Sequence, residues 1–371
     1  MKKLSLIALL TALVMVLGMV PMTAMAEGEK IALITDVGTI DDESFNQACW
    51  QGVEAYATAN NIEYVYYQPT ADSTDARLQA VDQAVAEGAT VIVMPGYLFG
   101  ATLVTCMEDY PEVTFIAVDV GAGDMTLDYA TYYEPLENTV CVTFAEEQAG
   151  YLAGYAAVKD GYTKLGFLGG MAVPAVIRYG YGFVQGADAA AAELGVEIEI
   201  NYTYGGQFFG SPEITAKMEG WYQAGTEIVF ACGGGIYTSA VEAATKVNGM
   251  VIGVDVDQHY VGENGIAAEQ YTYNPFVTSA MKGLQNVTET LLGEYFAGNF
   301  AEYGTKFINY SLTEGEYVGL PTAEESWCFK TFTVEEYEIV KNAIKDGTVV
   351  VSNDTENAPV VTEGTTVNYI A

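Results

Sequence analysis

The segment from Ile31 to Gly52 reads IALITDVGTIDDESFNQACWQG and contains one complete strand, loop and helix pattern. A short apolar run ends at Asp36, and a loop with Gly38 and three successive acids follows it. Apolar residues then recur at helical spacing from Phe45 onward, as on a helix that buries one face. This order is typical of the repeating unit of α/β proteins, in which a helix follows each buried parallel strand.

The same pattern recurs along the chain in two series. Apolar runs typical of buried strands lie at 31–36, 62–68, 90–96 and 114–120, and again at 164–170, 197–205, 227–234 and 250–257. Helix-length amphipathic stretches such as 77–86, 174–194 and 212–224 separate them. Continuous apolar strands with helical spacers predict parallel sheets that are covered on both faces. We therefore expect an α/β protein with two doubly wound parallel-sheet lobes joined by a short hinge.

Several of the expected strands end in residues suited to contact a ligand. Asp36, Asp119 and Asp255 each end or follow an apolar run, and the glycines at 233–235 follow another. In open α/β sheets, ligands bind beyond the carboxyl ends of the strands. Two lobes that face each other with such edges predict a ligand-binding cleft between them.

The length of 371 residues favours two domains, the N-terminal segment indicates export, and the charged residues make the protein acidic. Lys2 and Lys3, an apolar run and the small residues around Ala26 form the three regions of a signal peptide, so we expect residues 1–26 to be removed. The formal net charge then changes from −35 to −37. Such a surface repels phosphates, which makes nucleic acid and nucleotides poor ligands and favours a neutral or cationic small molecule.

Signatures of catalysis and of metal binding are few. His259 is the single histidine, which excludes a multi-histidine metal site and leaves little scope for histidine acid–base chemistry. The five cysteines are scattered without a C-x-x-C motif, and we expect buried free thiols. No G-x-S-x-G motif occurs, and the acids at 41–43 lack the spacing of a calcium loop. Glycosidases need a pair of catalytic carboxylates, and a chain with 49 acids could contain such a pair. No spacing of acids in the sequence favours one.

The residues alone leave two interpretations open at several candidate positions. Phe45 belongs to an apolar helical stripe, which favours a core position, but it also follows the acidic loop at the expected cleft. Asp119 can cap the turn that follows it or can hydrogen-bond a ligand. Lys282 is one of 14 basic residues and lies near the start of an expected helix at 275–292, where a surface position is the ordinary alternative.

Four segments together resemble a known family. They are DVGTIDDESFNQACWQG at 36–52, FAEEQAGYLAGYAA at 144–157, KLGFLGGMAVPAVIRYGYGFVQG at 164–186 and VIGVDVDQ at 251–258. In this order they are similar to the basic membrane protein family, the PnrA-like solute-binding proteins of ABC transporters. The likeness continues to YEIVKNAIKDGTVVVS at 337–352. It implies the type I periplasmic-binding-protein fold, without catalysis or a cofactor, and the capture of purine nucleosides for import.

The resemblance also implies which residues contact the purine base. It makes Phe45 the aromatic side chain that stacks on the base and Asn46 a polar contact to it. Asp119 matches the residue that pairs with the purine edge. Either Phe208 or Phe209 matches a loop aromatic that closes the other side of the base.

The same resemblance assigns the ribose and the partner. Asp255 and Lys282 match the residues that hold the ribose hydroxyls, and the backbone near Gly234 contributes as well. An ABC permease would receive the nucleoside from a monomeric binding protein. Family members usually carry a lipid-bearing cysteine just after the signal peptide, but the first cysteine here is Cys49. We therefore expect an extracellular or envelope-associated protein without that anchor.

The expected lobes and the competing functions complete the sequence-based hypothesis. The N-terminal lobe is expected to comprise 27–148 and 276–312, and the C-terminal lobe 149–275 and 313–371. Binding of another neutral solute, such as a sugar or a flavin-like compound, is the alternative within the same cleft. An envelope sensor or an extracellular enzyme is the alternative from another functional class.

Overall fold

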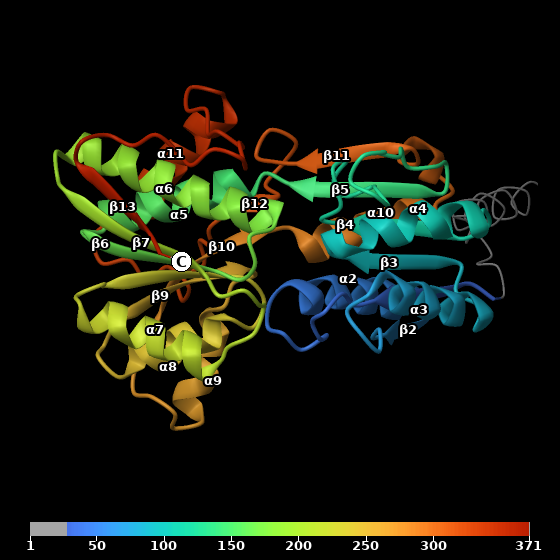
Figure 1. The fold of residues 1–371 in the computed structure, drawn as a ribbon, viewed down its shortest axis with the longest axis horizontal. Coiled ribbons are helices and arrows are strands. Elements are labelled where there is room, and N and C mark those ends of the chain that lie inside the picture. The colour runs from blue at the N-terminus through green and yellow to red at the C-terminus, as the bar shows by residue number, and fades with distance from the viewer. Residues whose placement is uncertain (1–27, 371) are drawn as a thin grey trace, which may run out of the picture.

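The structure is a computed structural model that describes residues 28–370 and divides them into two α/β lobes (Figure 1). The first lobe is built on a parallel sheet with the strand order β11-β5-β4-β3-β1-β2. Its strands are β1 (Lys30–Ile34), β2 (Glu63–Tyr67), β3 (Val91–Pro95), β4 (Thr114–Val118), β5 (Thr139–Phe144) and β11 (Lys306–Tyr310). Its helices are α2 (Phe45–Asn60), α3 (Thr74–Ala86), α4 (Gly100–Asp109) and α10 (Leu284–Phe296), with short 3-10 turns at Tyr97–Phe99 and Phe300–Glu302.

The second lobe has a sheet with the order β12-β10-β9-β8-β6-β7-β13, in which only β12 runs antiparallel. Its strands are β6 (Lys164–Gly169), β7 (Ile198–Tyr204), β8 (Ile228–Cys232), β9 (Met250–Asp255), β10 (Phe276–Lys282), β12 (Val318–Gly319) and β13 (Thr365–Tyr369). Its helices are α5 (Glu146–Lys159), α6 (Pro174–Leu194), α7 (Pro212–Gln223), α8 (Tyr237–Thr245), α9 (His259–Ala267) and α11 (Val334–Lys345). The expected doubly wound α/β class is confirmed.

Alternate residues of each central strand pack into cores on opposite faces of the sheet. In β1, Ile31 and Leu33 join a core with α2, whereas Ala32 and Ile34 join a second core with α3 and α4. In the second lobe, α5 and α6 cover one face, and α7 and α8 cover the other. Because both faces are buried, the strands lack polar alternation and read as continuous apolar runs.

Strand β10 corrects two expectations from the sequence. The helix expected at 275–292 is a strand followed by α10, so Lys282 ends a strand and does not begin a helix. Strand β10 also pairs with β9, which places residues 276–282 in the second lobe and not in the first. Nearly all of this strand is buried, and a short buried apolar run cannot be assigned to strand or helix by its periodicity.

The chain passes between the two sheets at three places near the hinge. It leaves the first sheet after β5, returns to the first lobe between β10 and α10, and crosses again between β11 and β12. Figure 1 shows the two lobes side by side with these connections between them. The carboxyl ends of the parallel strands in both lobes therefore face the junction, where a ligand cleft is expected.

Close packing of α5 on α6 places two helical side chains at this junction. A Cβ at Gly150 of α5 would lie 2.1 Å from the carbonyl oxygen of Tyr179, so only glycine permits the observed approach. Helix α6 begins with Pro174 at a position where no backbone donor is needed, and it ends before Gly195 in the left-handed region. Arg178 and Tyr179 are thereby fixed in its first turns.

The remaining sequence expectations concern the thiols and the N-terminus. All five cysteines are free, and Cys328 alone among them is partly exposed while the other four are buried. Within residues 28–370, no helix is both long and apolar enough to cross a membrane. The expected signal peptide at 1–26 lies outside the described residues.

Candidate functional site

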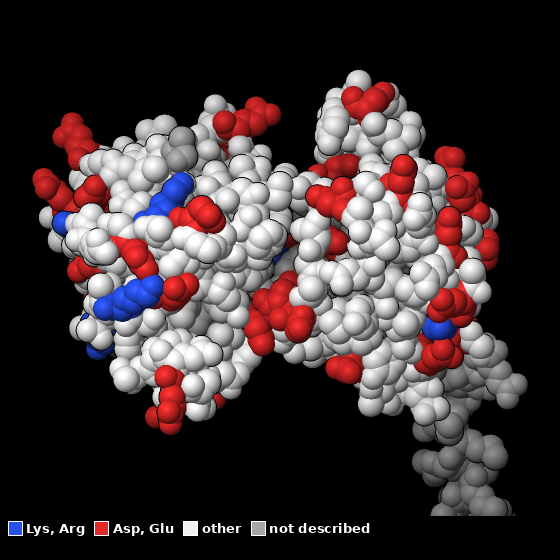
Figure 2. All heavy atoms as spheres, turned by 60° about the horizontal axis from the view of Figure 1, so that its bottom comes forward, with Lys and Arg blue, Asp and Glu red and all other residues white. Residues whose placement is uncertain are grey.

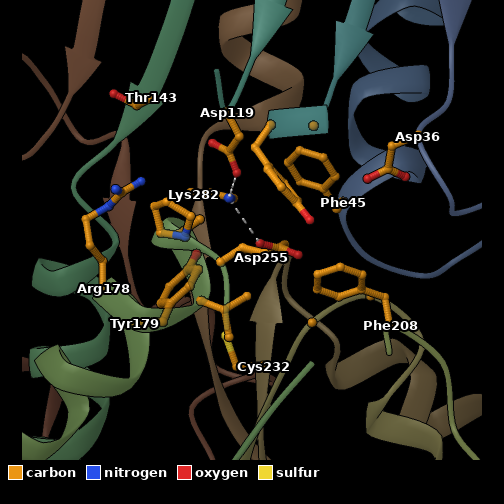
Figure 3. A pocket seen from close by; sticks show the side chains of 18 of the residues that line it. Asp36, Phe45, Asp119, Thr143, Arg178, Tyr179, Phe208, Cys232, Asp255 and Lys282 are labelled. Atoms are coloured by element: carbon orange, nitrogen blue, oxygen red, sulfur yellow. Dashed lines mark hydrogen bonds and ion pairs between the residues drawn. The ribbon is translucent and has the colours of Figure 1, made fainter. Parts of the chain in front are cut away.

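A cavity of about 460 Å³ lies between the lobes at the carboxyl ends of their strands (Figure 3). The first lobe lines it with loops after β1, β3 and β4 and with the start of α2, and the second lobe contributes the start of α6 and the ends of β8, β9 and β10. Its wall includes the side chains of Asp36, Asp42, Phe45, Asn46, Asp119, Arg178, Tyr179, Phe208, Asp255 and Lys282.

The structure brings together seven of the eight residues selected from the sequence. Phe45, Asn46, Asp119, Phe208, Gly234, Asp255 and Lys282 all line this cavity. Phe209 does not line it, because its side chain points to solvent and is 61% exposed. Of the two aromatic residues that the sequence left open, Phe208 is therefore the one that faces the cleft.

Two glycines make room for the ring of Phe208. A Cβ at Gly170 would lie 2.5 Å from Cδ1 of Phe208, and one at Gly233 would lie 3.0 Å from the same atom. Gly233 also has a φ of 141°, in the region that favours glycine. Gly170, which follows β6, and Gly233, which follows β8, thus hold an aromatic ring at the cavity wall.

Asp119 and Asp255 have the same unusual backbone conformation in opposite lobes. Asp119 follows β4 with a φ of 58°, and Asp255 ends β9 with a φ of 66°. Non-glycine residues rarely adopt positive φ, and when they do they cluster at functional sites. Both side chains are buried and line the cavity, so this backbone strain marks the cavity floor in both lobes.

Lys282 is the central cation of the site. Its Nζ donates to Asp119 and to Oε1 of Glu146 at 3.2 Å, and it lies 3.7 Å from Oδ1 of Asp255 (Figure 3). Burial opposes its charge, but these three carboxylates raise the pKa of Lys282, which therefore stays protonated. Its Nζ also lies 4.9 Å from the centroid of the Phe45 ring, within the range of a cation–π contact.

The three acids around Lys282 differ in how burial and nearby cations shift their pKa. It raises the pKa of Asp119 to about 7 although Lys282 opposes the shift. Burial also raises the pKa of Asp255, again against Lys282 and a hydrogen bond from Ser44. Glu146 behaves differently, because Arg178 and Lys282 outweigh its burial and lower its pKa. Within residues 28–370, Oδ1 of Asp119 has no hydrogen-bond partner and is left for a further donor.

Arg178 and Tyr179 belong to the site but were not among the residues selected from the sequence. Arg178 Nε donates to the buried Glu146 at 2.7 Å. Arg178 and Tyr179 line the cavity together with Lys282. In Figure 3 they lie on the side of Lys282 opposite to Phe208. Their sequence signal is weak, because an arginine and a tyrosine in the first turns of a helix fit a surface or a core position equally well.

The acidic loop has a structural purpose at the start of α2. The carboxylate of Asp42 accepts hydrogen bonds from the backbone N–H groups of Ser44, Asn46 and Gln47 at 3.0–3.1 Å. An acid at this place also suits the positive end of the helix. The Asn46 side chain donates to Asp36 at 3.1 Å and to Asp42 at 3.0 Å. Asn46 lines the cavity and also orients Asp36, a strand-end residue to which the family resemblance assigned no role.

The cavity carries more acids than bases. Asp36, Asp42, Asp119, Asp124 and Asp255 line it, against Arg178 and Lys282, and both bases are already paired with buried Glu146. Figure 2 shows the same excess outside, with acidic side chains at the waist between the lobes. Such a site favours a neutral ligand with several hydrogen-bond donors over an anion. Among residues 28–370, no group of three or more His, Cys, Asp or Glu side chains could hold a metal ion.

Comparison with known proteins identifies the family of this chain. A family model for PnrA-like ABC transporter substrate-binding proteins matches residues 29–355. The ABC transporter nucleoside-binding protein BmpA of Lactococcus lactis subsp. cremoris is 27% identical over 299 residues, which are 77% of this chain and 80% of that protein. Basic membrane protein A1 of Borrelia garinii subsp. bavariensis is 30% identical over 297 residues, which are 78% of this chain and 79% of that protein.

Solved structures agree with the fold. A solute-binding protein of an ABC transporter system from Aeropyrum pernix superposes with a TM-score of 0.71 at 19% identity, covering 88% of this chain and 94% of that one. A second such protein, from Conexibacter woesei, gives a TM-score of 0.66 at 19% identity and covers 87% of this chain and 98% of that one. These likenesses confirm the expected periplasmic-binding-protein fold. With the family match, they show that this chain belongs to the PnrA-like family of ABC transporter substrate-binding proteins.

Proposed function

We propose that the protein binds a purine nucleoside in the cavity between its lobes and delivers it to an ABC permease. The observation that carries this proposal is the pair of aromatic rings, Phe45 and Phe208, which line one cavity from opposite lobes. A purine base is a flat, neutral ring system, and each stacking contact contributes about 1–3 kcal/mol. A relative is itself named as a nucleoside-binding protein.

The polar groups at the cavity floor suit the rest of a nucleoside. Ribose hydroxyls donate hydrogen bonds to carboxylates and accept them from an ammonium group, and Asp255 and Lys282 lie together at the floor. Asp119 and the Asp36–Asn46 pair provide fixed acceptors for donors on the base. A ligand without those donors would leave buried acceptors unpaired, which is the basis of selectivity in such sites.

The charge of the cavity argues against nucleotides. A phosphate would bring at least one further negative charge into a site where five carboxylates line the wall against two paired bases. We therefore propose nucleosides as ligands and exclude nucleotides and nucleic acid. In this proposal the protein is an exported monomer without catalytic activity, and its partner is the permease.

A calorimetric ligand panel tests the proposal. Inosine, guanosine and adenosine are titrated into the protein, with the matching monophosphates, ribose, glucose and riboflavin as comparisons. We expect binding of at least one purine nucleoside with one site per chain, and at least tenfold weaker binding of its monophosphate at moderate salt. Binding of a sugar or riboflavin without any nucleoside would assign another solute, and release of free base from the nucleoside would indicate an enzyme.

A further inference from the structure

The loop that precedes α2 is hydrogen-bonded to the opposite lobe at Asp255 of the cavity floor and at two residues outside the cavity, Gln258 and Tyr260. Ser44 Oγ donates to Oδ2 of Asp255 at 2.6 Å, and Gln258 Nε2 donates to the carbonyl oxygen of Glu43 at 2.8 Å. The Tyr260 hydroxyl donates to the Glu43 carboxylate. Glu43 and Ser44 belong to the first lobe, and the three partners belong to the end of β9 and the start of α9 in the second lobe.

The residues on each side of this contact are also constrained within their own lobe. Gln258 is fully buried, its Oε1 accepts from the backbone of Val254 at 3.0 Å, and its own N–H donates to Ser279 at 3.0 Å. On the other side, Glu43 has a φ of 54°, which is unfavourable for a glutamate and is maintained by its surroundings. The contact therefore joins two preformed surfaces.

The Ser44 hydroxyl is free for this purpose because it does not cap its own helix. Ser44 occupies the N-cap position of α2 but makes no capping hydrogen bond, since Asp42 accepts from the backbone there. Ser44 is completely buried, and its hydroxyl donates to Asp255. The bond leaves Oδ1 of Asp255 on the side of Lys282, 3.7 Å from its Nζ.

We propose that Glu43 and Ser44, together with Gln258 and Tyr260, form an interlobe clasp that holds the loop carrying Phe45 and Asn46 against the second lobe and orients Asp255. Ser44, Glu43, Gln258 and Tyr260 are thus positioning residues for the ligand site. Phe45 directly follows Ser44 in the chain, so an opened clasp displaces the aromatic ring together with the loop. The clasp is a property of the protein without ligand, and only its effect on affinity rests on the proposed function.

Hydrogen–deuterium exchange of the ligand-free protein tests the clasp first. The backbone N–H groups of Ser44, Asn46 and Gln47 are hydrogen-bonded within the loop and report its opening. In Ser44→Ala we expect exchange at 43–47 to become about tenfold faster, with α10 and α11 unchanged. Tyr260→Phe removes only the hydroxyl of a partly exposed side chain, so the variant should fold. We expect its exchange at 43–47 to be faster than in wild type but slower than in Ser44→Ala.

Ligand kinetics distinguish a clasp from a merely structural contact. For the purine nucleoside that binds wild type, we expect Ser44→Ala to bind about tenfold more weakly through faster dissociation, with the association rate nearly unchanged. The matched control is Thr333→Ala, which removes a hydroxyl that does cap its helix, α11. This control should lower the melting temperature while leaving loop exchange and ligand dissociation as in wild type.

The possible results separate the clasp from the proposed function. Unchanged exchange at 43–47 in both Ser44→Ala and Tyr260→Phe overturns the clasp. Faster exchange with unaltered ligand dissociation overturns the positioning role. If wild type binds no purine nucleoside, the proposed function is wrong, and the exchange of the two variants still decides whether the clasp exists.

Discussion

Replacement of Phe45 by alanine separates its two structural roles. The Phe45 ring lines the cavity, lies 4.9 Å from the ammonium group of Lys282 and packs with its other side against the core. Loss of one stacking contact should weaken nucleoside binding by about 1–3 kcal/mol, which is about 5- to 150-fold in affinity. We place the expected loss toward the upper end of that range, because the cation–π contact with Lys282 is lost as well.

The stability of the ligand-free protein should change much less. A fully buried phenylalanine costs about 3–5 kcal/mol when it is truncated to alanine. Phe45 is only partly buried, and one side of its ring faces a cavity. Truncation therefore removes fewer packing contacts, and we expect a loss on the order of 1–2 kcal/mol in the free energy of unfolding.

Two measurements on one variant give the answer. Urea unfolding of the ligand-free protein gives the stability change, and calorimetry with the best-bound nucleoside gives the affinity change. Phe209→Ala is the matched control, because Phe209 is 61% exposed and does not line the cavity. The control should retain wild-type affinity and wild-type stability within about 0.5 kcal/mol.

The opposite pair of effects would contradict the binding role of Phe45. A Phe45→Ala protein that loses about 3–5 kcal/mol of stability but binds the nucleoside normally would show that Phe45 is a core residue. The role of the loop at 36–46 in ligand binding would then have to be abandoned.

Further predictions concern protonation, packing and processing. Burial raises the pKa of Glu147 to about 7 from 4.5. The folded protein therefore binds this proton more tightly, and the associated stability is lost as pH rises from about 4.5 through about 7. Glu147→Gln should raise the melting temperature at about pH 8 and flatten its decrease between about pH 5 and 8, and an unchanged profile would contradict the shift. Gly170→Ala places a Cβ 2.5 Å from the Phe208 ring and should weaken nucleoside binding about as much as Phe208→Ala, as titration can show. Mass spectrometry of the exported protein should find an unlipidated N-terminus near Glu27, and a diacylglycerol adduct would refute this.

The fold was predictable where the sequence has regular periodicity. All eight strand candidates coincide with strands of the structure to within two residues at each end, and the expected helix at 174–194 coincides with α6. Strand β10 was missed because a buried strand has no alternating pattern, and helix and strand then differ only in length. Its correct assignment moves Lys282 from the start of a helix to the cavity floor.

The site was predictable where topology places a residue at a strand end. Asp119 and Asp255 follow strong apolar runs, and the α/β rule puts both at the cleft without further information. Loop residues have no such rule, so neighbouring Phe208 and Phe209 could not be distinguished. Arg178 was missed because its role depends on a partner distant in sequence, Glu146 on α5, which only the helix packing reveals.

The central claim is that the base of a purine nucleoside lies between aromatic rings from the two lobes. The most direct test is a crystal structure of the protein with inosine, or with whichever purine nucleoside binds best. We expect the base to lie between Phe45 and Phe208 and the ribose hydroxyls to contact Asp255 and Lys282. A complex in which the base lies outside the two rings, with neither Phe45 nor Phe208 in contact with it, would contradict the account.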